Sequence, residues 1–256
     1  DPALCAFFGG LRVYCGPKGM VGAPDVLYRN EGDGQFSDAT QISGISQANR
    51  YYGLGVIPSD YDLDGDRDLF VANDETPNVL FQNQGDGTFR DVGLIAGVAY
   101  NGDGDAEAGM GVDFGDYDND GDLDVFFANF GANTFYRNHG NGRFTEITEQ
   151  VGIQGKEWST SAAFVDIDRD GALDLYVVNY VKYDPTIECR GDNSTPDFCG
   201  PGNFAPTMDN LYRNKGDGTF SEISTSVGIN APGKGLGVVT ADFSGDGWAD
   251  LYICLL

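Results

Sequence analysis

The chain has 256 residues and is strongly acidic, with 40 Asp and Glu against 15 Lys and Arg and a net charge of −25. A phosphate backbone or an anionic lipid surface would repel such a chain, which argues against nucleic-acid binding and binding to lipid headgroups. Hydrophobic residues make up 41% of the sequence, enough for a folded core. The longest apolar runs have the length of a strand, so we expect no insertion into a membrane.

One segment occurs four times. Each copy has alternating apolar residues, then an Asn, a Gly-Asp-Gly or Gly-Asn-Gly turn and an aromatic residue. The copies are residues 25–36, 78–89, 133–144 and 210–220. Asp-Gly and Asn-Gly pairs tolerate the positive φ angles of a tight turn, and the alternation has the period of a half-buried strand. Each copy therefore predicts a β-hairpin.

A second segment alternates with these hairpins. It begins with Gly-x-Gly-Val, or Ser-Thr-Ser-Ala in the third copy, and continues with an Asp-rich loop and a short apolar run. This order predicts a strand, a loop and a second strand. The copies begin at Gly53, Gly109, Ser159 and Gly235. One such unit and one hairpin give four strands in about fifty residues, which is typical of a propeller blade.

These units predict an all-β fold, a single β-propeller domain over residues 1–256 built from four-stranded antiparallel blades. Complete blades are expected at 53–91, 109–147 and 159–223, with an insertion at 181–206. Residues 25–40 supply only two outer strands and residues 235–256 only two inner strands, so one blade is split between the termini. Three arrangements stay open: a closed four-bladed ring, a fragment of a larger propeller, or subunits that complete one another and polymerise.

The four Asp-rich loops share a nine-residue pattern, with oxygen-bearing side chains at positions 1, 3, 5 and 9 and Gly at position 6. Together with the backbone carbonyl of position 7, these oxygens would surround one point. Calcium is a hard cation that takes six to eight oxygen ligands, so the pattern predicts a calcium site. The absence of His and Cys from the loops argues against zinc and copper. The predicted ligands of about four ions are Asp60, Asp62, Asp64, Asp66, Asp68, Asp116, Asp118, Asp120, Asp122, Asp124, Asp166, Asp168, Asp170, Ala172, Asp174, Asp242, Ser244, Asp246, Trp248 and Asp250.

The alternative is a merely solvated acidic surface. Like charges this close repel, and Lys and Arg are too scarce to offset them, so four loops in one register favour a bound cation. A strand follows position 9 directly, in place of the bidentate Glu and helix of an EF-hand. We therefore expect structural braces between strands, and we expect chelation to lower the melting temperature.

These residues resemble the integrin-type FG-GAP, or VCBS-like, calcium-binding β-propellers. The combination of Leu-Tyr-Arg-Asn-x-Gly-Asp-Gly-x-Phe with Gly-x-Gly-Val and Asp-x-Asp-x-Asp-Gly is similar to ASPIC/UnbV-associated secreted bacterial proteins and to the animal cartilage acidic proteins. The resemblance implies that each calcium loop joins the innermost strand of a blade to the second, and that the hairpin supplies the third and outer strands. It also implies that the ligands are the Asp positions given above, with Ser244 as a departure.

The cysteines have a duplicated spacing. Cys5 and Cys15 are separated by nine residues, as are Cys189 and Cys199, and Gly-Pro follows the second cysteine of each pair. This predicts two local disulfides, one in an N-terminal loop at residues 1–24 and one in the insertion. Disulfides together with calcium indicate a secreted, extracellular or periplasmic protein. The fifth cysteine, Cys254, lies in a predicted strand and is expected to be a buried thiol.

Two short motifs lie in the second cysteine loop. Arg190-Gly191-Asp192 resembles an integrin-binding tripeptide, but in a chain rich in Gly and Asp we interpret it as accidental. Asn193-Ser194-Thr195 fits an N-glycosylation acceptor, which makes Asn193 a candidate modification site.

Candidate catalytic residues are few. The single histidine, His139, lies in a hairpin turn, and residues 102–107 could supply paired carboxylates but are interpreted as a loop near calcium. The leading hypothesis is a non-enzymatic, calcium-rigidified module for binding, adhesion or surface assembly, with a protein or glycan ligand or self-association through its terminal strands. One alternative is the propeller scaffold of a carbohydrate-active enzyme, such as a polysaccharide lyase or sugar dehydratase. Another is a structural subunit of a filament or other homopolymer.

Overall fold

The computed structural model describes residues 4–6, 12–14, 17, 20–47, 51–153, 155–190, 196–197 and 199–256. Three four-stranded antiparallel sheets form the centre of this described part, and we call them blades one, two and three. Blade one contains β5 (Gly53–Ser59), β6 (Asp68–Asn73), β7 (Val79–Asn83) and β8 (Phe89–Asp91). Blade two contains β9 (Gly109–Gly115), β10 (Asp124–Asn129), β11 (Thr134–Asn138) and β12 (Phe144–Glu146). Blade three contains β13 (Ser159–Val165), β14 (Asp174–Asn179), β19 (Asn210–Asn214) and β20 (Phe220–Glu222).

The other described strands form two-stranded sheets. These are β1 (Leu4–Ala6) with β2 (Arg12–Tyr14), β3 (Tyr28–Gly32) with β4 (Gln35–Asp38), β15 (Val181–Lys182) with β18 (Ala205–Pro206), β16 (Cys189–Arg190) with β17 (Pro196–Asp197), and β21 (Gly235–Ala241) with β22 (Asp250–Leu255). The helices are single turns: α1 (Gly93–Ala96), α2 (Thr148–Val151) and 3₁₀ turns at Ile45–Gln47, Pro201–Asn203 and Ser224–Val227. No helix of the described ranges has the length and apolar character needed to cross a membrane.

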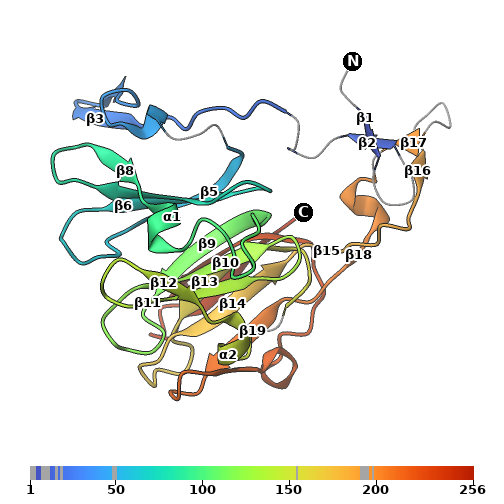
Figure 1. Ribbon diagram of the computed structural model, residues 1–256. Coiled ribbons are helices and arrows are strands. Elements are labelled where there is room, and N and C mark those ends of the chain that lie inside the picture. The colour runs from blue at the N-terminus through green and yellow to red at the C-terminus, as the bar shows by residue number, and fades with distance from the viewer. Residues whose placement is uncertain are drawn as a thin grey trace.

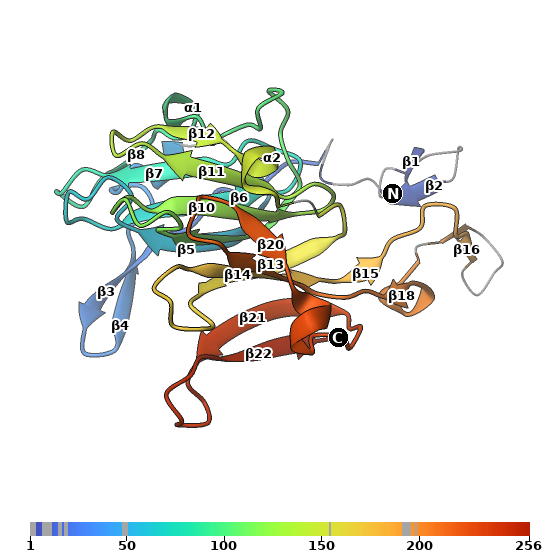
Figure 2. The ribbon, with the colours of Figure 1, turned by 90° about the horizontal axis from the view of Figure 1, so that it is seen from below.

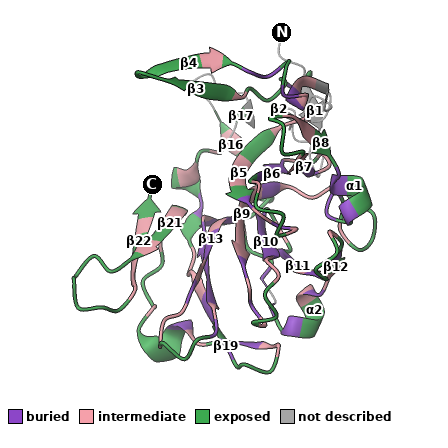
Figure 3. Ribbon diagram, turned by 90° about the vertical axis from the view of Figure 1, so that its left-hand side faces the viewer, coloured by how far each residue is buried: buried purple, intermediate pink, exposed green. Residues whose placement is uncertain are grey.

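The blades lie side by side in chain order (Figures 1 and 2). The first strands of neighbouring blades are in contact, β5 with β9, β9 with β13, and β13 with β21. Aromatic side chains fill the space between blades; for example, the rings of Phe70 in blade one and Phe127 in blade two have centroids 4.9 Å apart. The burial colouring of Figure 3 shows the same pattern, with buried strands in the middle of the row and exposed strands at both ends.

Glycines in the first strands allow this close approach. A Cβ atom on Gly111 of β9 would lie 2.6 Å from the backbone oxygen of Thr160 in β13, and one on Gly55 of β5 would lie 3.5 Å from the Cα of Gly111. At Gly111 the backbones of blades two and three therefore meet where a side chain would overlap, whereas a Cβ at Gly55 would make an ordinary van der Waals contact. Blade packing thus explains the second glycine of the motif in blade two.

The predicted four-stranded units are confirmed, but the split blade is not assembled. The hairpins β3–β4 and β21–β22 belong to separate sheets, one adjoining blade one and the other adjoining blade three. The segment that follows β4 is hydrogen-bonded to blade one, since the amide of Phe89 in β8 donates to the carbonyl of Ser43. At the other end of the row, β21 packs against β13. A closed four-bladed ring is therefore absent from the described part of the chain.

The disulfide Cys189–Cys199 is confirmed. Cys15 lies outside the described residues, so the predicted Cys5–Cys15 bond is not described. Strand β2 of the N-terminal loop contacts β17 of the insertion, so the two cysteine loops lie together (Figure 1). The expectation of a buried Cys254 is wrong: its thiol is free and exposed, because none of the described blades covers the outer face of β21–β22.

We predict opposite outcomes for one substitution at two equivalent glycines. Gly111→Ala should lower the free energy of unfolding by about 1–3 kcal/mol, because the new methyl group would overlap the backbone of blade three. Gly237→Ala is the matched control, since a Cβ there meets nothing within 4 Å. Urea unfolding of both variants checks this, and an equal loss of stability in the two would contradict it.

Candidate metal centres and a ligand cavity

The first three acidic loops each bring together the carboxylates of positions 1, 3 and 9. In each group one oxygen atom from every residue lies within 4.8 Å of the others. The groups are Asp60, Asp62 and Asp68; Asp116, Asp118 and Asp124; and Asp166, Asp168 and Asp174. Each loop connects the first strand of a blade to the second, so the groups lie at the same end of the three blades.

The carboxylate at position 9 fastens each loop to the neighbouring hairpin. Asp124, which is fully buried, accepts bonds from the amides of Tyr117 at position 2 (3.2 Å) and Asn138 of β11 (2.8 Å). The equivalent bonds reach Asp68 and Asp174 in the other blades. The hairpin asparagine thus positions a carboxylate that lies 14 residues earlier in the chain.

The same asparagines connect neighbouring blades. The side-chain amide of Asn138 in blade two donates to the carbonyl of Tyr61 in the acidic loop of blade one (2.8 Å). Asn214 of blade three donates in the same way to Tyr117 of blade two (2.7 Å). The hairpin asparagine therefore holds both the acidic loop of its own blade and the acidic loop of the preceding blade.

Several of the converging oxygens have no hydrogen-bond partner although they are buried. These atoms are Asp60 Oδ1, Asp62 Oδ1, Asp118 Oδ1, Asp166 Oδ1 and Asp168 Oδ1. A buried carboxylate oxygen without a donor is costly, and a hard divalent cation is the partner that the all-oxygen donor set fits. Burial raises the pKa of Asp68 to about 6 and that of Asp124 to about 7, and a bound cation would favour their ionised forms.

The other predicted ligands of these loops, at positions 5 and 7, stay predictions. The position 5 carboxylates, Asp64, Asp120 and Asp170, lie outside the three groups, and one oxygen of each accepts the amide of position 7 within the turn. At position 7 the predicted ligand is the backbone carbonyl, and the side chains of Asp66 and Asp122 lie beside the hairpin glycines Gly85 and Gly140. The backbone of these turns is strained. Position 4 has a positive φ angle in all three loops, at Leu63, Asn119 and Arg169, two residues before the glycine at position 6.

A residue of the hairpin that the sequence analysis did not assign also contacts these loops. The side chain before each hairpin asparagine pairs with the position 3 carboxylate: Gln82 with Asp62 (2.7 Å), Arg137 with Asp118 (2.7 Å) and Arg213 with Asp168. The signal was present, because this Arg belongs to the repeated Leu-Tyr-Arg-Asn motif. Its partner, however, is far along the chain, and only the pairing of the second and third strands brings them together.

The fourth loop does not assemble a comparable group. Asp242 accepts the amides of Gly245, Asp246 and Gly247, and Asp250 accepts those of Phe243 and Ser244. Both carboxylates therefore accept hydrogen bonds from amides of their own turn. Position 3 carries Ser244 in place of the aspartate of the other three loops, so this loop lacks one negative charge. The hairpin that would order this loop is missing from the β21–β22 sheet.

The remaining candidates from the sequence have ordinary surroundings. His139 is exposed in its hairpin turn and its Nε2 lies 2.8 Å from the Thr145 hydroxyl. Burial raises the pKa of Glu107 to about 7, and this carboxylate accepts bonds from Asn129, Thr134 and Tyr136 at the end of β9 away from its acidic loop. Residues 191–195, which include Asn193 and most of the Arg-Gly-Asp motif, lie outside the described residues.

A cavity of about 440 Å³ lies at the opposite end of the strands from the acidic loops, between blades two and three. Phe130, Trp158 and Tyr183 line it, and their rings pack edge to face with centroids 4.7–5.9 Å apart. Lys156 and Lys182 also line it, although the whole chain has only five lysines. The only carboxylate among the described lining residues is Glu157.

We predict that the two kinds of loop carboxylate differ in the absence of metal. Asp124→Ala should cost about 2–4 kcal/mol in EDTA, because it leaves two buried amides without an acceptor. Asp118→Asn is the matched control: it removes a like charge, its amide oxygen can still accept from Arg137, and Arg137 keeps its ion pair with Asp120, so in EDTA its stability should equal or exceed that of the parent chain. Urea unfolding in EDTA measures both, and a large loss for Asp118→Asn would contradict the assignment.

Comparison with known proteins places this geometry in a family. The FG-GAP-like repeat matches residues 60–127, 116–177 and 195–253. Mouse and human cartilage acidic protein 1 are 29% and 28% identical to the chain over 93% of its length, and the Xenopus tropicalis protein is 32% identical over 73%. The chain spans about a third of the mouse and human relatives and 26% of the Xenopus one.

A solved structure also aligns with the chain. It is described as the basis of recognition of non-reducing terminal N-acetylglucosamine by an Agrocybe aegerita lectin. The alignment has a TM-score of 0.48 and 16% identity and covers 90% of this chain and 55% of the lectin, which is too remote to inform fold or ligand. The repeats, the loops they position and the matched residues show that the chain belongs to the FG-GAP-like repeat family.

Proposed function

We propose that this chain is a calcium-stabilised, extracellular binding module in which three acidic loops hold structural ions. The observation that supports it best is the set of buried, unpartnered carboxylate oxygens at positions 1 and 3. Like-charged groups within 4.8 Å repel one another, and a divalent cation would convert that repulsion into a cross-link between strands.

Calcium fits these loops better than magnesium does. Each loop offers three carboxylates and backbone carbonyls in a nine-residue turn, whereas magnesium keeps several waters and demands near-octahedral geometry. A module with a disulfide and structural calcium suits an oxidising, calcium-rich compartment, so we propose that it works outside the cytoplasm.

For the ligand we propose a saccharide bound in the aromatic cavity. Aromatic faces are electron-rich and pack well against the polarised C–H faces of a sugar ring. The lysines beside these rings would select an acidic sugar, since they are rare positive groups on a strongly acidic protein. The cavity is also large enough to bury a sugar residue.

The cavity supports binding more than catalysis. Hydrolysis of a glycosidic bond usually needs two carboxyl groups at the bond, and among the described lining residues only Glu157 supplies one. An enzyme scaffold therefore remains our second hypothesis, favoured only by the size and aromatic character of the cavity.

The calcium proposal predicts that chelation destabilises the protein. Excess EDTA should lower Tm by several degrees or more, calcium should restore it, and the same concentration of magnesium should restore less. Elemental analysis of dialysed protein should give about three calcium ions per monomer. The Asp118→Asn variant should bind one ion fewer and show a smaller difference in Tm between calcium and EDTA. A parent chain whose melting curve is the same in calcium and in EDTA would contradict the proposal.

The ligand proposal predicts a fluorescence response from Trp158. Trp248→Phe leaves Trp158 as the single tryptophan, so its emission can be titrated with uronate-bearing and neutral oligosaccharides. Tyr183→Ala in this background should weaken binding roughly tenfold, about 1.4 kcal/mol, and Lys182→Ala should weaken only the acidic sugars. Leu94→Ala on the exposed face of α1 is the control. No saturable response to any saccharide would refute the assignment.

A further inference from the structure

The residue before each hairpin asparagine contacts one oxygen of the position 3 carboxylate and leaves the other oxygen without a donor. In blade two, Nη2 of Arg137 lies 2.7 Å from Oδ2 of Asp118, while Oδ1 of Asp118 is buried without a hydrogen-bond partner. In blade one, Nε2 of Gln82 donates to Oδ2 of Asp62 (2.7 Å), and Oδ1 of Asp62 is again buried and unpartnered. The hairpin residue therefore orients this carboxylate without using the oxygen that is left for a cation.

The charge of this orienting residue differs between the blades. Arg137 of blade two also lies 2.9 Å from the carboxylate of Asp120 at position 5. Arg213 of blade three lies 3.6 Å from that of Asp170 in the same way. Gln82 of blade one is neutral. A guanidinium therefore offsets the repulsion between the carboxylates of two loops, whereas the carboxylates of blade one have only a neutral amide at this place.

The acidic loops of blades one and two are otherwise closely matched. Both have aspartate at positions 1, 3, 5, 7 and 9, so both offer a cation the same number of carboxylates. In both, the position 9 carboxylate accepts the amides of position 2 and of the hairpin asparagine. Arg67 at position 8 of blade one is exposed, and the ion pairs of the described residues do not include it. The main electrostatic difference is therefore the hairpin residue that contacts Asp62 or Asp118.

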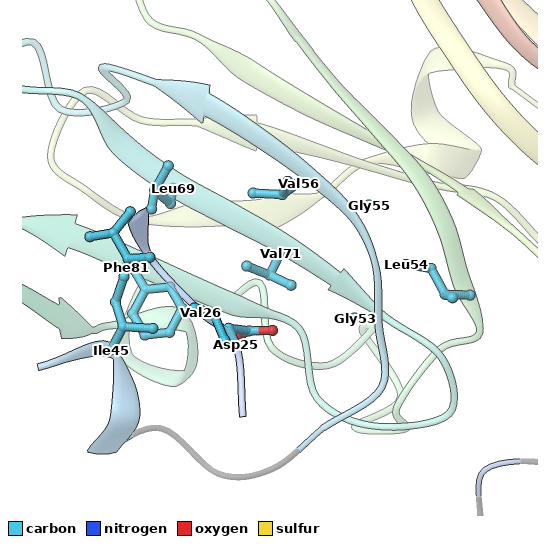
Figure 4. Close-up of a pocket in the computed structure, with 11 residues that line it drawn as sticks. Asp25, Val26, Ile45, Gly53, Leu54, Gly55, Val56, Leu69, Val71 and Phe81 are labelled. Atoms are coloured by element: carbon cyan, nitrogen blue, oxygen red, sulfur yellow. The ribbon is translucent and has the colours of Figure 1, made fainter. Parts of the chain in front are cut away.

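Within the described ranges, no cationic side chain forms an ion pair with the position 3 carboxylate of blade one. Arg90 of β8 donates to Oε1 of Gln82 (3.1 Å), so its charge lies one side chain further out. The face of blade one away from blade two carries a cavity of about 240 Å³ that extends to Leu69, the residue after Asp68 (Figure 4). Its described lining residues are apolar except for Asp25. The carboxylates of this loop are therefore the least compensated of the three.

We propose that the residue before the hairpin asparagine sets the calcium affinity of each acidic loop, and that the loop of blade one binds calcium more tightly than those of blades two and three. The guanidinium of Arg137 or Arg213 repels a cation bound beside it, whereas Gln82 does not. Calcium affinity in proteins is tuned by the charge count of the site. This inference rests on the proposed calcium function and adds an order of filling to it, with blade one occupied first as calcium rises.

The same residues give the opposite order of stability without calcium. The guanidinium groups hold the carboxylates of blades two and three together, so these loops keep part of their stability in a chelator. The loop of blade one has no such group, so its folded conformation depends most on the ion. The arginines thus act as built-in counter-ions, and they lower the calcium affinity of the loops that they stabilise.

Exchange of the hairpin residues tests this order. Gln82→Arg combined with Arg90→Thr gives blade one the cross-strand pair that blade two has in Arg137 and Thr145. It should weaken the tightest calcium-binding step of the full chain roughly tenfold, whereas Arg90→Thr alone should leave that step within about twofold. Arg137→Gln should strengthen a weaker step by roughly tenfold. Calorimetric titration of calcium into the chelator-treated chain measures these affinities.

Further variants assign the steps and control for a general effect of charge. Asp62→Asn should abolish the tightest step, whereas Asp118→Asn should leave it in place. Arg143→Gln removes a positive charge from the exposed turn of the same hairpin as Arg137, and it should leave every step unchanged. In about 1 M salt the tenfold differences should shrink to about threefold, because screening weakens repulsion between charges but not packing.

The outcomes separate this inference from the proposed function. Opposite shifts from the two exchanges, with Arg137→Gln lowering Tm in EDTA while it tightens calcium binding, support the inference, because a packing defect would weaken both. Exchanges that leave the affinities unchanged or shift them in one direction overturn the order of the sites and leave the calcium function intact. Loss of the tightest step in Asp118→Asn does the same. A parent chain that binds no calcium overturns both.

Discussion

The organisation of this protein depends on holding like-charged carboxylates together. In each of three loops, three carboxylates approach within 4.8 Å, an arrangement that electrostatic repulsion opposes. The position 9 carboxylate is held by two backbone amides, one from its own loop and one from the hairpin asparagine. Because that asparagine also bonds to the loop of the preceding blade, the acidic groups and the packing of the blades form one connected network.

The two ends of the strands carry different features. The acidic loops lie at one end, where short turns and backbone hydrogen bonds fix their shape. The aromatic cavity lies at the other end, about 20 Å away along a six-residue strand, where loops of different length meet between blades two and three. The loops at the two ends can therefore vary independently, and in the proposed function one end stabilises the fold while the other binds the ligand.

The repeat architecture explains why the two end hairpins differ from the rest. Each blade contacts only its neighbours, so a unit lacking one neighbour exposes the same positions that are buried elsewhere. Tyr28, Tyr252 and Val56 are exposed for this reason, although their equivalents form the core. The same dependence reaches the fourth acidic loop, which has the sequence pattern of the others but lacks the hairpin that orders them.

The sequence by itself determined the all-β class, the limits of the complete blades to within a residue, the Cys189–Cys199 bond and the acidic loops, because these are local or periodic features. Turn residues, strand alternation and the nine-residue spacing act over short distances. Only the tertiary structure decided which carboxylates converge, the partners of Arg137 and Asn138, the aromatic cavity and the exposure of Cys254. Those features depend on contacts between strands and blades that are far apart in the chain. A buried copy and an exposed copy of one motif have the same residues, so the sequence pattern does not distinguish them.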